Sequence, residues 1–296
     1  MAGMDRPGQA RYKGHFPIID GCRKDRSHRM NAAQWQALRA WFDAYVQGFY
    51  TGPARHDAHI RLKQLHTQKV CEEIEYLCTA LGLDESDHLL AEAVALLHDV
   101  GRFEQYRRHQ TFMDARSENH CLLGLEIIAA HGVLDDFEAS ERDVILTAVR
   151  HHGARVLPDG LPERTALFCR LIRDADKIDI FRVVLDNYRR WKESPEGFVL
   201  AVPFPDEDTY NPALLEAVIE GRTIDYRELR TIHDVRLLQL GWIHDINFPA
   251  TLARIRQRGH LAEFLAGLPA DEACDRLRRY VTQYVKDRLL LETGDH

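Results

Sequence analysis

The chain has 296 residues, of which 45% are hydrophobic and 29% charged, and a formal net charge of −7. This composition is that of a globular protein with an ample core, and the acidic balance argues against a nucleic-acid polymer as a partner. The sequence contains no apolar run of about 18 residues, no signal-peptide core and no Cys-x-x-Cys pair among its six cysteines. We therefore expect a cytoplasmic protein with reduced cysteines and no membrane contact.

Helical periodicity dominates the chain from residue 31 onward. Residues 1–30 are polar, with early glycine and proline, and predict a loosely packed N-terminal arm. Apolar residues at helical spacing then predict helices that are separated by breaks rich in glycine, proline and aspartate. In chain order these helices cover about residues 31–50, 59–81, 84–98, 117–130, 137–149 and 164–191, with Asn31, Asp84 or Ser86, and Ser117 as N-caps. Residues 103–114 are aromatic and basic without a clean period, and we expect an ordered loop or a short helical turn there.

The last third of the chain continues this pattern after one loop. Residues 194–208 contain three prolines and a glycine, so we place a loop over residues 191–210. Asn211 as N-cap and Pro212 at the first helical position then predict a helix start. Helices are expected over about residues 211–221, 227–240, 248–258, 260–268 and 270–291. Since no alternating strand pattern occurs, we predict an all-α fold, with a helical core over residues 31–190 and a helical extension over residues 211–296 that packs on it.

Two side chains that can bind metal, His98 and Asp99, follow a buried apolar run. Gly101 follows two residues after Asp99, and we expect it to supply the left-handed backbone that often ends a helix. Neutral imidazole and carboxylate groups are good ligands for Zn, Mn or Fe. Three more His-Asp pairs occur, at residues 56–57, 233–234 and 244–245, and we interpret them as structural.

Further residues of the same chemical types recur at separations of about one helix plus its connection. The complete set is His66, His98, Asp99, His120, His151 and Asp176, each near a predicted helix end or on a buried face. Successive helices of a bundle can therefore each deliver a ligand to a common centre. Six ligands are too many for one tetrahedral site but fit two metal ions bridged by a carboxylate. Two choices stay open, because His152 could replace His151 and Asp174 could replace Asp176.

This order of ligands resembles the HD-domain superfamily of metal-dependent phosphohydrolases, an all-helical group named for its His-Asp pair. His66, the pair at residues 98–99 and Asp176 match its four basic positions, and the family pattern favours Asp176 because it directly precedes Lys177. His120 and His151 match two extra histidines of a bimetallic branch, which includes cyclic-dinucleotide phosphodiesterases and a few di-iron oxygenases. The resemblance covers about residues 58–190. The chain departs from it in two places: no Gly-Tyr-Pro extension follows residues 151–153, and Arg102 stands where many relatives have Lys or His.

The resemblance implies that the cofactor is a pair of divalent metal ions, and these could be Mn, Fe, Zn, Mg or Ni. It places Asp99 between the ions, His66, His98 and Asp176 on one of them, and His120 and His151 on the other. A hydroxide between the ions would attack phosphorus. Asp99, Lys177 and Arg102 are then the expected catalytic residues. Arg102, Arg116 and Lys177 are expected to bind the phosphate oxygens of a small phosphorylated metabolite or nucleotide.

Two other functions are compatible with the same ligand set. One is a di-iron oxygenase that cleaves a C–C or C–P bond with dioxygen. The other is a non-catalytic protein in which the metal holds the bundle together or helps to sense a nucleotide. We expect the C-terminal helices to cover one end of the bundle, to shape the substrate pocket or to form a homodimer contact.

Overall fold

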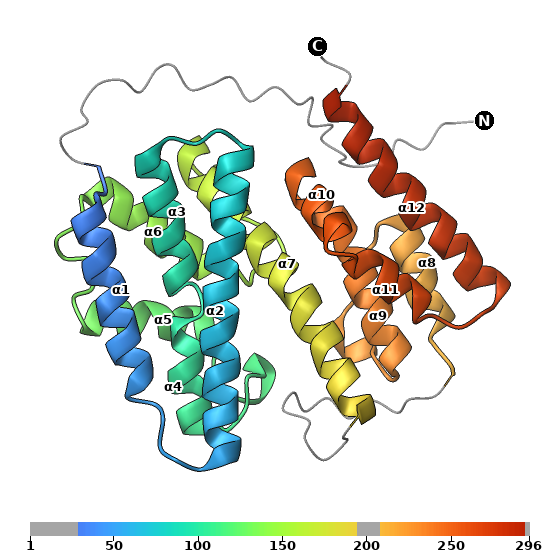
Figure 1. The fold of residues 1–296 in the computed structure, drawn as a ribbon, viewed down its shortest axis with the longest axis horizontal. Coiled ribbons are helices and arrows are strands. Elements are labelled where there is room, and N and C mark those ends of the chain that lie inside the picture. Colours follow the sequence, from blue (N-terminus) through green and yellow to red (C-terminus); the bar gives the residue numbers. More distant parts are fainter. Residues whose placement is uncertain (1–28, 194–207, 294–296) are drawn as a thin grey trace.

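The computed structural model describes residues 29–193 and 208–293 (Figure 1). These residues form helices joined by short connections, and they contain no strand, so the predicted all-α fold is confirmed. None of the helices in these two ranges is long and apolar enough to cross a membrane. The arm expected over residues 1–30 and the loop expected over residues 191–210 lie largely outside the described residues.

The helices form two groups, with one long helix, α7, between them (Figure 1). The first group comprises α1 (Ala32–Gln47), α2 (Ala54–Ala80), α3 (Glu85–Leu97), α4 (Val100–His109), α5 (His120–Ala130) and α6 (Ala139–His151), and is followed by α7 (Glu163–Glu193). The second group comprises α8 (Pro212–Glu220), α9 (Ile232–Gly241), α10 (Pro249–Gln257), α11 (His260–Ala266) and α12 (Glu272–Thr293). Short 3-10 helices cover Asp114–Arg116, Tyr226–Glu228 and Trp242–Asp245.

Polar caps begin several helices at the predicted residues. Asn31 forms a capping box at the start of α1, and Asp84 caps α3 through its side chain. Asn211 caps α8, with proline in the first turn as expected. The start of α5 was predicted wrongly, because Asn119 rather than Ser117 is its N-cap.

Two further predictions about local structure need correction. The segment over residues 103–114 is not mainly a loop, because α4 runs as a regular α-helix to His109. Gly101 does not end the preceding helix in a left-handed conformation; it lies in the first turn of α4 and has no positive φ. A Cβ atom on Gly101 would collide with the carbonyl oxygen of His120 and lie 2.7 Å from the amide nitrogen of Gly124. Gly101 therefore lets α4 and α5 pack backbone against backbone.

Helix α3 lies at the centre of the first group. Its residues from Leu90 to Leu97 are almost all buried, and it packs against α1, α2, α6 and α7. His98 and Asp99 follow at its C-terminal end, so the chain delivers them to the interior of the bundle. On the other side, α10 and α11 pack against α7, and α10 also reaches α2.

Candidate metal centre

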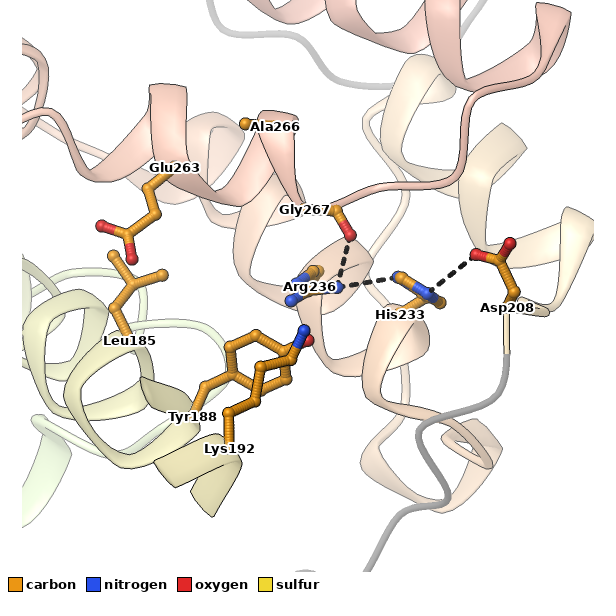
Figure 2. A pocket seen from close by; sticks show the side chains of 9 residues that line it. All are labelled: Leu185, Tyr188, Lys192, Asp208, His233, Arg236, Glu263, Ala266 and Gly267. Carbon is orange, nitrogen blue, oxygen red and sulfur yellow. Dashed lines mark hydrogen bonds and ion pairs between the residues drawn. The ribbon is translucent and has the colours of Figure 1, made fainter. Parts of the chain in front are cut away.

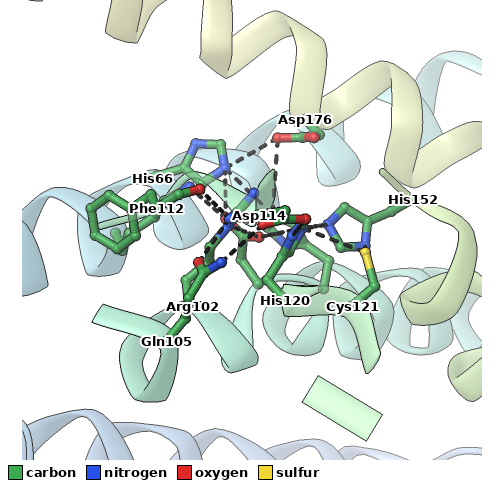
Figure 3. Close-up of polar contacts among 12 residues, drawn as sticks. His66, Arg102, Gln105, Phe112, Asp114, His120, Cys121, His152 and Asp176 are labelled. Carbon is green, nitrogen blue, oxygen red and sulfur yellow. Dashed lines mark hydrogen bonds and ion pairs between the residues drawn. The ribbon is translucent and has the colours of Figure 1, made fainter. Parts of the chain in front are cut away.

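Four histidines from four different parts of the bundle meet around Asp99. Figure 3 labels three of them, His66, His120 and His152. They are His66 of α2, His98 after α3, His120 at the start of α5 and His152 after α6. All four, and Asp99 itself, are buried. Asp176 of α7 joins them with its side chain 17% exposed. The cluster therefore has one side that solvent can reach.

The carboxylate of Asp99 directs one oxygen toward each of two histidine pairs. Its Oδ2 lies 3.6 Å from His66 Nε2 and 3.8 Å from His98 Nε2. Its Oδ1 lies 3.5 Å from His120 Nε2 and 3.6 Å from His152 Nε2. The result is two adjacent groups of donor atoms that share a single carboxylate.

Asp176 belongs to the first of these groups. Its Oδ1 lies 3.1 Å from His66 Nε2 and 3.9 Å from His98 Nε2. The two imidazoles of this pair are themselves close, with their Nε2 atoms 3.4 Å apart. The first group thus offers two nitrogens and two carboxylates, and the second offers two nitrogens and the shared carboxylate.

The Nδ1 atom of each imidazole is bound on the side away from Asp99. In His98, Nδ1 lies 2.7 Å from the carbonyl oxygen of Ala95, and in His152 it lies 2.8 Å from that of Val149. Because a carbonyl oxygen can only accept, Nδ1 carries the proton in both rings. In the neutral ring Nε2 is then a free lone pair that faces Asp99.

Carboxylates bind Nδ1 of the other two imidazoles, so these rings also direct Nε2 toward Asp99. Asp179 Oδ2 lies 2.7 Å from His66 Nδ1, and Asp114 Oδ2 lies 2.7 Å from His120 Nδ1. The four rings thus all present Nε2 to the centre, which is how metal-ligating histidines are usually held by an outer partner.

The two imidazoles of the second group face each other closely. The Nε2 atoms of His120 and His152 are 3.1 Å apart, although both Nδ1 atoms are already committed as donors. Two facing lone pairs at this distance repel unless a proton or a cation lies between them. The donor set therefore fits a cation, since a metal ion accepts both lone pairs at once.

Two positive side chains lie beside Asp99. Lys63 Nζ is 2.7 Å from Asp99 Oδ2, and Arg102 Nε is 3.4 Å from Asp99 Oδ1. Burial alone would raise the pKa of the Asp99 carboxyl, but Lys63, His98 and Arg102, together with the hydrogen bond from His152, hold it well below its usual value. Asp99 is therefore ionised, as a bridging ligand must be.

The histidines themselves differ in proton affinity. Burial lowers the pKa of His98 to about 4, so this ring is neutral near pH 7. For His152 burial acts in the same direction, but hydrogen bonds to Asp99 and Cys121 outweigh it and raise the pKa to about 10. In the absence of a metal the second group therefore holds a proton, which a bound cation would displace.

The HD domain family model matches residues 64–180 of the chain. The matched span contains the four histidines, Asp99 and Asp176. Residues 64–180 form an HD domain. This confirms the resemblance seen in the sequence, and the groups formed by His66, His98 and Asp99 and by His120, Cys121 and His152 fit the metal-binding site of such a domain. No curated protein and no solved structure is similar enough to the chain to count as a match.

The HD domain family consists mostly of metal-dependent hydrolases. At the family level the domain therefore indicates metal-dependent hydrolysis, and its His, Asp and Cys clusters indicate divalent metal binding.

The structure brings five of the six residues selected from the sequence together in the HD domain. The sixth choice needs correction, because His152 and not His151 lies in the cluster. Helix α6 ends at His151, which is only half-buried, and His152 is the capping residue whose ring turns inward. Asp174, the alternative to Asp176, is fully buried elsewhere and accepts hydrogen bonds from Asn247, Phe248 and Thr251 at the start of α10.

Of the three cationic residues selected from the sequence, only Arg102 reaches the centre of the HD domain. Lys177 is buried, but its Nζ lies 2.9 Å from Asp245 Oδ2 and its hydrogen bond goes to the carbonyl oxygen of Arg173. Arg116 is exposed on its 3-10 helix. Both residues therefore lie away from the contacts that surround Asp99.

Sequence reasoning missed four residues that shape the HD-domain centre. Asp114 and Asp179 orient histidines, and Lys63 contacts Asp99 from a position three residues before His66, one helical turn away. Cys121 is buried, with its Sγ 3.4 Å from His120 Nε2 and 3.6 Å from His152 Nδ1. Burial would raise the pKa of this thiol, but the two histidines lower it to about 6. Only the positions of Lys63 and Cys121, close in sequence to the predicted ligands His66 and His120, could have drawn attention to them.

Proposed function

We propose that the HD domain binds two divalent metal ions and hydrolyses a phosphoester bond in a small phosphorylated metabolite or nucleotide. The supporting observation is the placement of Asp99, whose two oxygens each lie 3.5–3.8 Å from the Nε2 atoms of a different histidine pair. A carboxylate shared by two ions is typical of bimetallic phosphoester hydrolysis. In this proposal His66, His98 and Asp176 hold one ion, His120 and His152 hold the other, and Asp99 binds both.

The donor atoms narrow the choice of metal. Four imidazole nitrogens suit Mn, Fe, Ni or Zn, whereas Mg prefers sites made of oxygen ligands. The second group in particular offers two nitrogens and one carboxylate oxygen, with the Cys121 thiol beside them. We therefore expect a first-row transition metal or zinc rather than magnesium.

The residues around the centre would each have a defined task. When bound, two divalent ions supply an acidified water molecule and neutralise charge on the phosphoryl oxygens. Asp179 and Asp114 keep the lone pairs of His66 and His120 directed inward. Arg102 Nε lies 3.4 Å from Asp99 Oδ1 but makes no hydrogen bond in the described residues, so it can donate one to a phosphate oxygen. Lys63, with its side chain 18% exposed, can approach the same oxygens from the opposite side of Asp99.

These contacts change the set of phosphate-binding residues that we expect. Lys63 and Arg102 lie beside Asp99, whereas Lys177 is paired with Asp245 and Arg116 is exposed. We therefore propose Lys63 and Arg102 as the groups that bind the substrate phosphate. The described positions favour a structural role for Lys177 and a surface position without a role in the site for Arg116.

The first experiment is elemental analysis of protein purified without chelator, as wild type and as His120→Ala. About two metal ions per chain are expected in the wild type, and one or fewer in the variant, because His120 serves only the second group. The same proteins are then assayed on a panel of phosphomonoesters and phosphodiesters, with Asp99→Asn as the inactive control.

Three outcomes would contradict the proposal in different ways. One metal ion in both proteins would remove His120 and His152 from the centre. No metal in either, even after reconstitution, would exclude metal-dependent catalysis. Iron together with dioxygen consumption and no phosphate release would assign the di-iron oxygenase function instead.

A further inference from the structure

A cavity lies away from the metal centre, between the C-terminal half of α7 and helices α9 and α11 (Figure 2). Its volume is about 570 Å³, which is in the usual range for small-molecule sites. Tyr188, in its wall, follows Asp176 by twelve residues on the same helix, a separation of about 18 Å at the α-helical rise. The cavity is therefore distinct from the proposed active site. Its lining residues are Leu185, Tyr188, Lys192, Asp208, His233, Arg236, Glu263, Ala266 and Gly267.

Arg236 is the unusual residue of this cavity. It is only 6% exposed, yet no carboxylate in the described part of the chain forms an ion pair with it. Its Nη1 donates to His233 Nδ1 at 2.9 Å and to the carbonyl oxygen of Gly267. Both acceptors are neutral, because a histidine Nδ1 that accepts a hydrogen bond carries no proton. A buried guanidinium with no counter-ion is destabilising, and a bound anion would remove that cost.

The position of the guanidinium is well defined. Its Cζ lies 4.2 Å from the centre of the Tyr188 ring, and on another side it meets Gly267. A Cβ atom at Gly267 would lie 2.7 Å from Cζ and 2.8 Å from Nε, so a larger residue would push the guanidinium away. The group is therefore held in a slot, with Nε and Nη2 donating to no acceptor among the described residues.

A second positive charge lies close by. Lys192 Nζ is 5.0 Å from the centre of the same Tyr188 ring, and Figure 2 shows it directed toward Arg236. Two cations near one ring repel each other, and an anion that contacts both would reverse the sign of that interaction.

The two carboxylates of the lining do not neutralise Arg236. Glu263 forms an ion pair with Arg189, whose Nε lies 2.8 Å from Glu263 Oε1. The side chain of Asp208 is 92% exposed, and its Oδ1 lies 3.8 Å from His233 Nε2. Neither of these two carboxylates is therefore an ion-pair partner of Arg236.

We propose that this cavity binds a small organic oxyanion, that is, a metabolite with a phosphate or carboxylate group. The anionic group contacts the Nε and Nη2 donors of Arg236, which present the planar fork that suits both kinds of oxyanion. The remainder of the ligand lies along Leu185 and the Tyr188 ring. The site is separate from the metal centre and needs none of its residues.

Calorimetric titration with inorganic phosphate and, separately, with benzoate tests this proposal. The parent protein is Asp99→Asn, in which the shared metal ligand is lost, so that phosphate does not bind through metal ions at that centre, and binding that remains at Lys63 and Arg102 is unaffected by a change at Arg236. We expect at least one of the two anions to bind. Adding Arg236→Met should weaken that binding by at least tenfold, because the charged donors are removed while the side-chain stem is kept. Binding of phosphate alone or of benzoate alone identifies the kind of oxyanion.

Two further variants separate this effect from loss of folding. Ala266 is an exposed lining residue, so Ala266→Glu should fold normally and weaken binding to the same degree by supplying a competing carboxylate. Arg276→Met removes an exposed arginine that is paired with Glu216 outside the cavity, and it should change nothing. The proposal is wrong if the Arg236 and Ala266 variants bind like the parent. It is also wrong if the parent binds neither anion at about 10 mM, above the usual range for enzyme ligands.

Discussion

His98 and His152 occupy equivalent positions in the chain, although they belong to different helices. Each is the residue that caps the C-terminus of its helix, and each donates Nδ1–H to the carbonyl oxygen three residues earlier. Such carbonyls have no partner within the helix, so a capping histidine binds one of them without competition. This local contact directs Nε2 into the bundle. It also explains why His152 and not its neighbour His151 belongs to the metal centre.

The pair His151 and His152 gives a matched test of this geometry. His152→Ala should remove the second metal ion, because only His120 and Asp99 would remain in that group. His151→Ala changes a half-buried ring outside the cluster and should leave metal content and activity as in the wild type. Elemental analysis of both variants, purified in parallel, provides the comparison. Loss of metal from the His151 variant alone would reverse the assignment.

Most of the cluster around Asp99 could be predicted from the sequence, since His66, His98, Asp99, His120 and Asp176 all lie in it. Their spacing of about one helix plus its connection indicated a common centre, because a bundle brings successive helix ends together, and the family resemblance favoured Asp176 over Asp174. The partners of these ligands could not be predicted. Asp179 meets His66 across 113 residues of sequence, and no local pattern encodes such a contact. The choice between His151 and His152 depended on the last residue of a helix, which sequence patterns locate poorly.

At the scale of elements, the contact between α4 and α5 positions two of the three residues of the second group, Asp99 and His120. Asp99 immediately precedes α4, and His120 begins α5. The two helices come close because Gly101 meets the backbone at His120 and Gly124 without a side chain between them. The separation of Asp99 from His120 therefore depends on this glycine.

Gly101→Ala should disrupt this contact. Its Cβ atom would collide with backbone rather than with a flexible side chain, so α4 and α5 must move apart, at a cost of about 1–3 kcal/mol or more. Gly241→Ala is the control, because this glycine is also helical and its Cβ would lie 3.7 Å from the nearest atom, in ordinary contact. That variant should be neutral or more stable by up to about 1 kcal/mol. Urea unfolding measures both, and equal effects would show that the close contact is unimportant.

The predicted elements were most accurate where the signal was local. The caps Asn31, Asp84 and Asn211 depend on neighbouring residues only, and they were predicted correctly. Helix α4 was missed because buried polar residues interrupt its apolar period. Glu104 and Gln105 are 7% and 0% exposed, and Gln105 donates to groups in the following connection. These residues are buried for tertiary hydrogen bonds, which a hydrophobicity pattern cannot show.

At the scale of the whole molecule, α10 connects the HD domain to the C-terminal helices. Asp174, on α7, accepts hydrogen bonds from backbone N–H groups at residues 247 and 248, where α10 begins. Near the other end of α10, Arg254 and Arg258 form ion pairs with Glu73 of α2. The C-terminal helices are thus attached to two of the helices that carry metal-centre residues, His66 and Asp176.

Metal removal should lower the stability of the whole chain. A metal ion whose free concentration is about one hundred times its dissociation constant stabilises the folded protein by about 2.7 kcal/mol. Chelator should therefore lower the Tm by about 5 °C or more. Thermal unfolding of the wild type and of Asp99→Asn, with and without chelator, measures this, and the variant should not respond. An equal response in the two proteins would place the stabilising ion elsewhere.

Glu73 offers a direct test of the connection through α10. Its side chain is 2% exposed and lies between the two arginines, with Oε2 2.8 Å from Arg254 Nε. Glu73→Gln removes the negative charge and leaves two guanidinium groups that are 22% and 28% exposed. Because these groups can be partly rehydrated, the expected loss in unfolding free energy is about 1–3 kcal/mol, less than for a fully buried pair. Glu72→Gln is the control, because Glu72 is 51% exposed and, within residues 29–193 and 208–293, pairs along its own helix with Lys69, so its change should stay within about 0.5 kcal/mol. Urea denaturation measures the unfolding free energy of both variants. Similar losses in the two proteins would mean that Glu73 does not hold α10 to the HD domain.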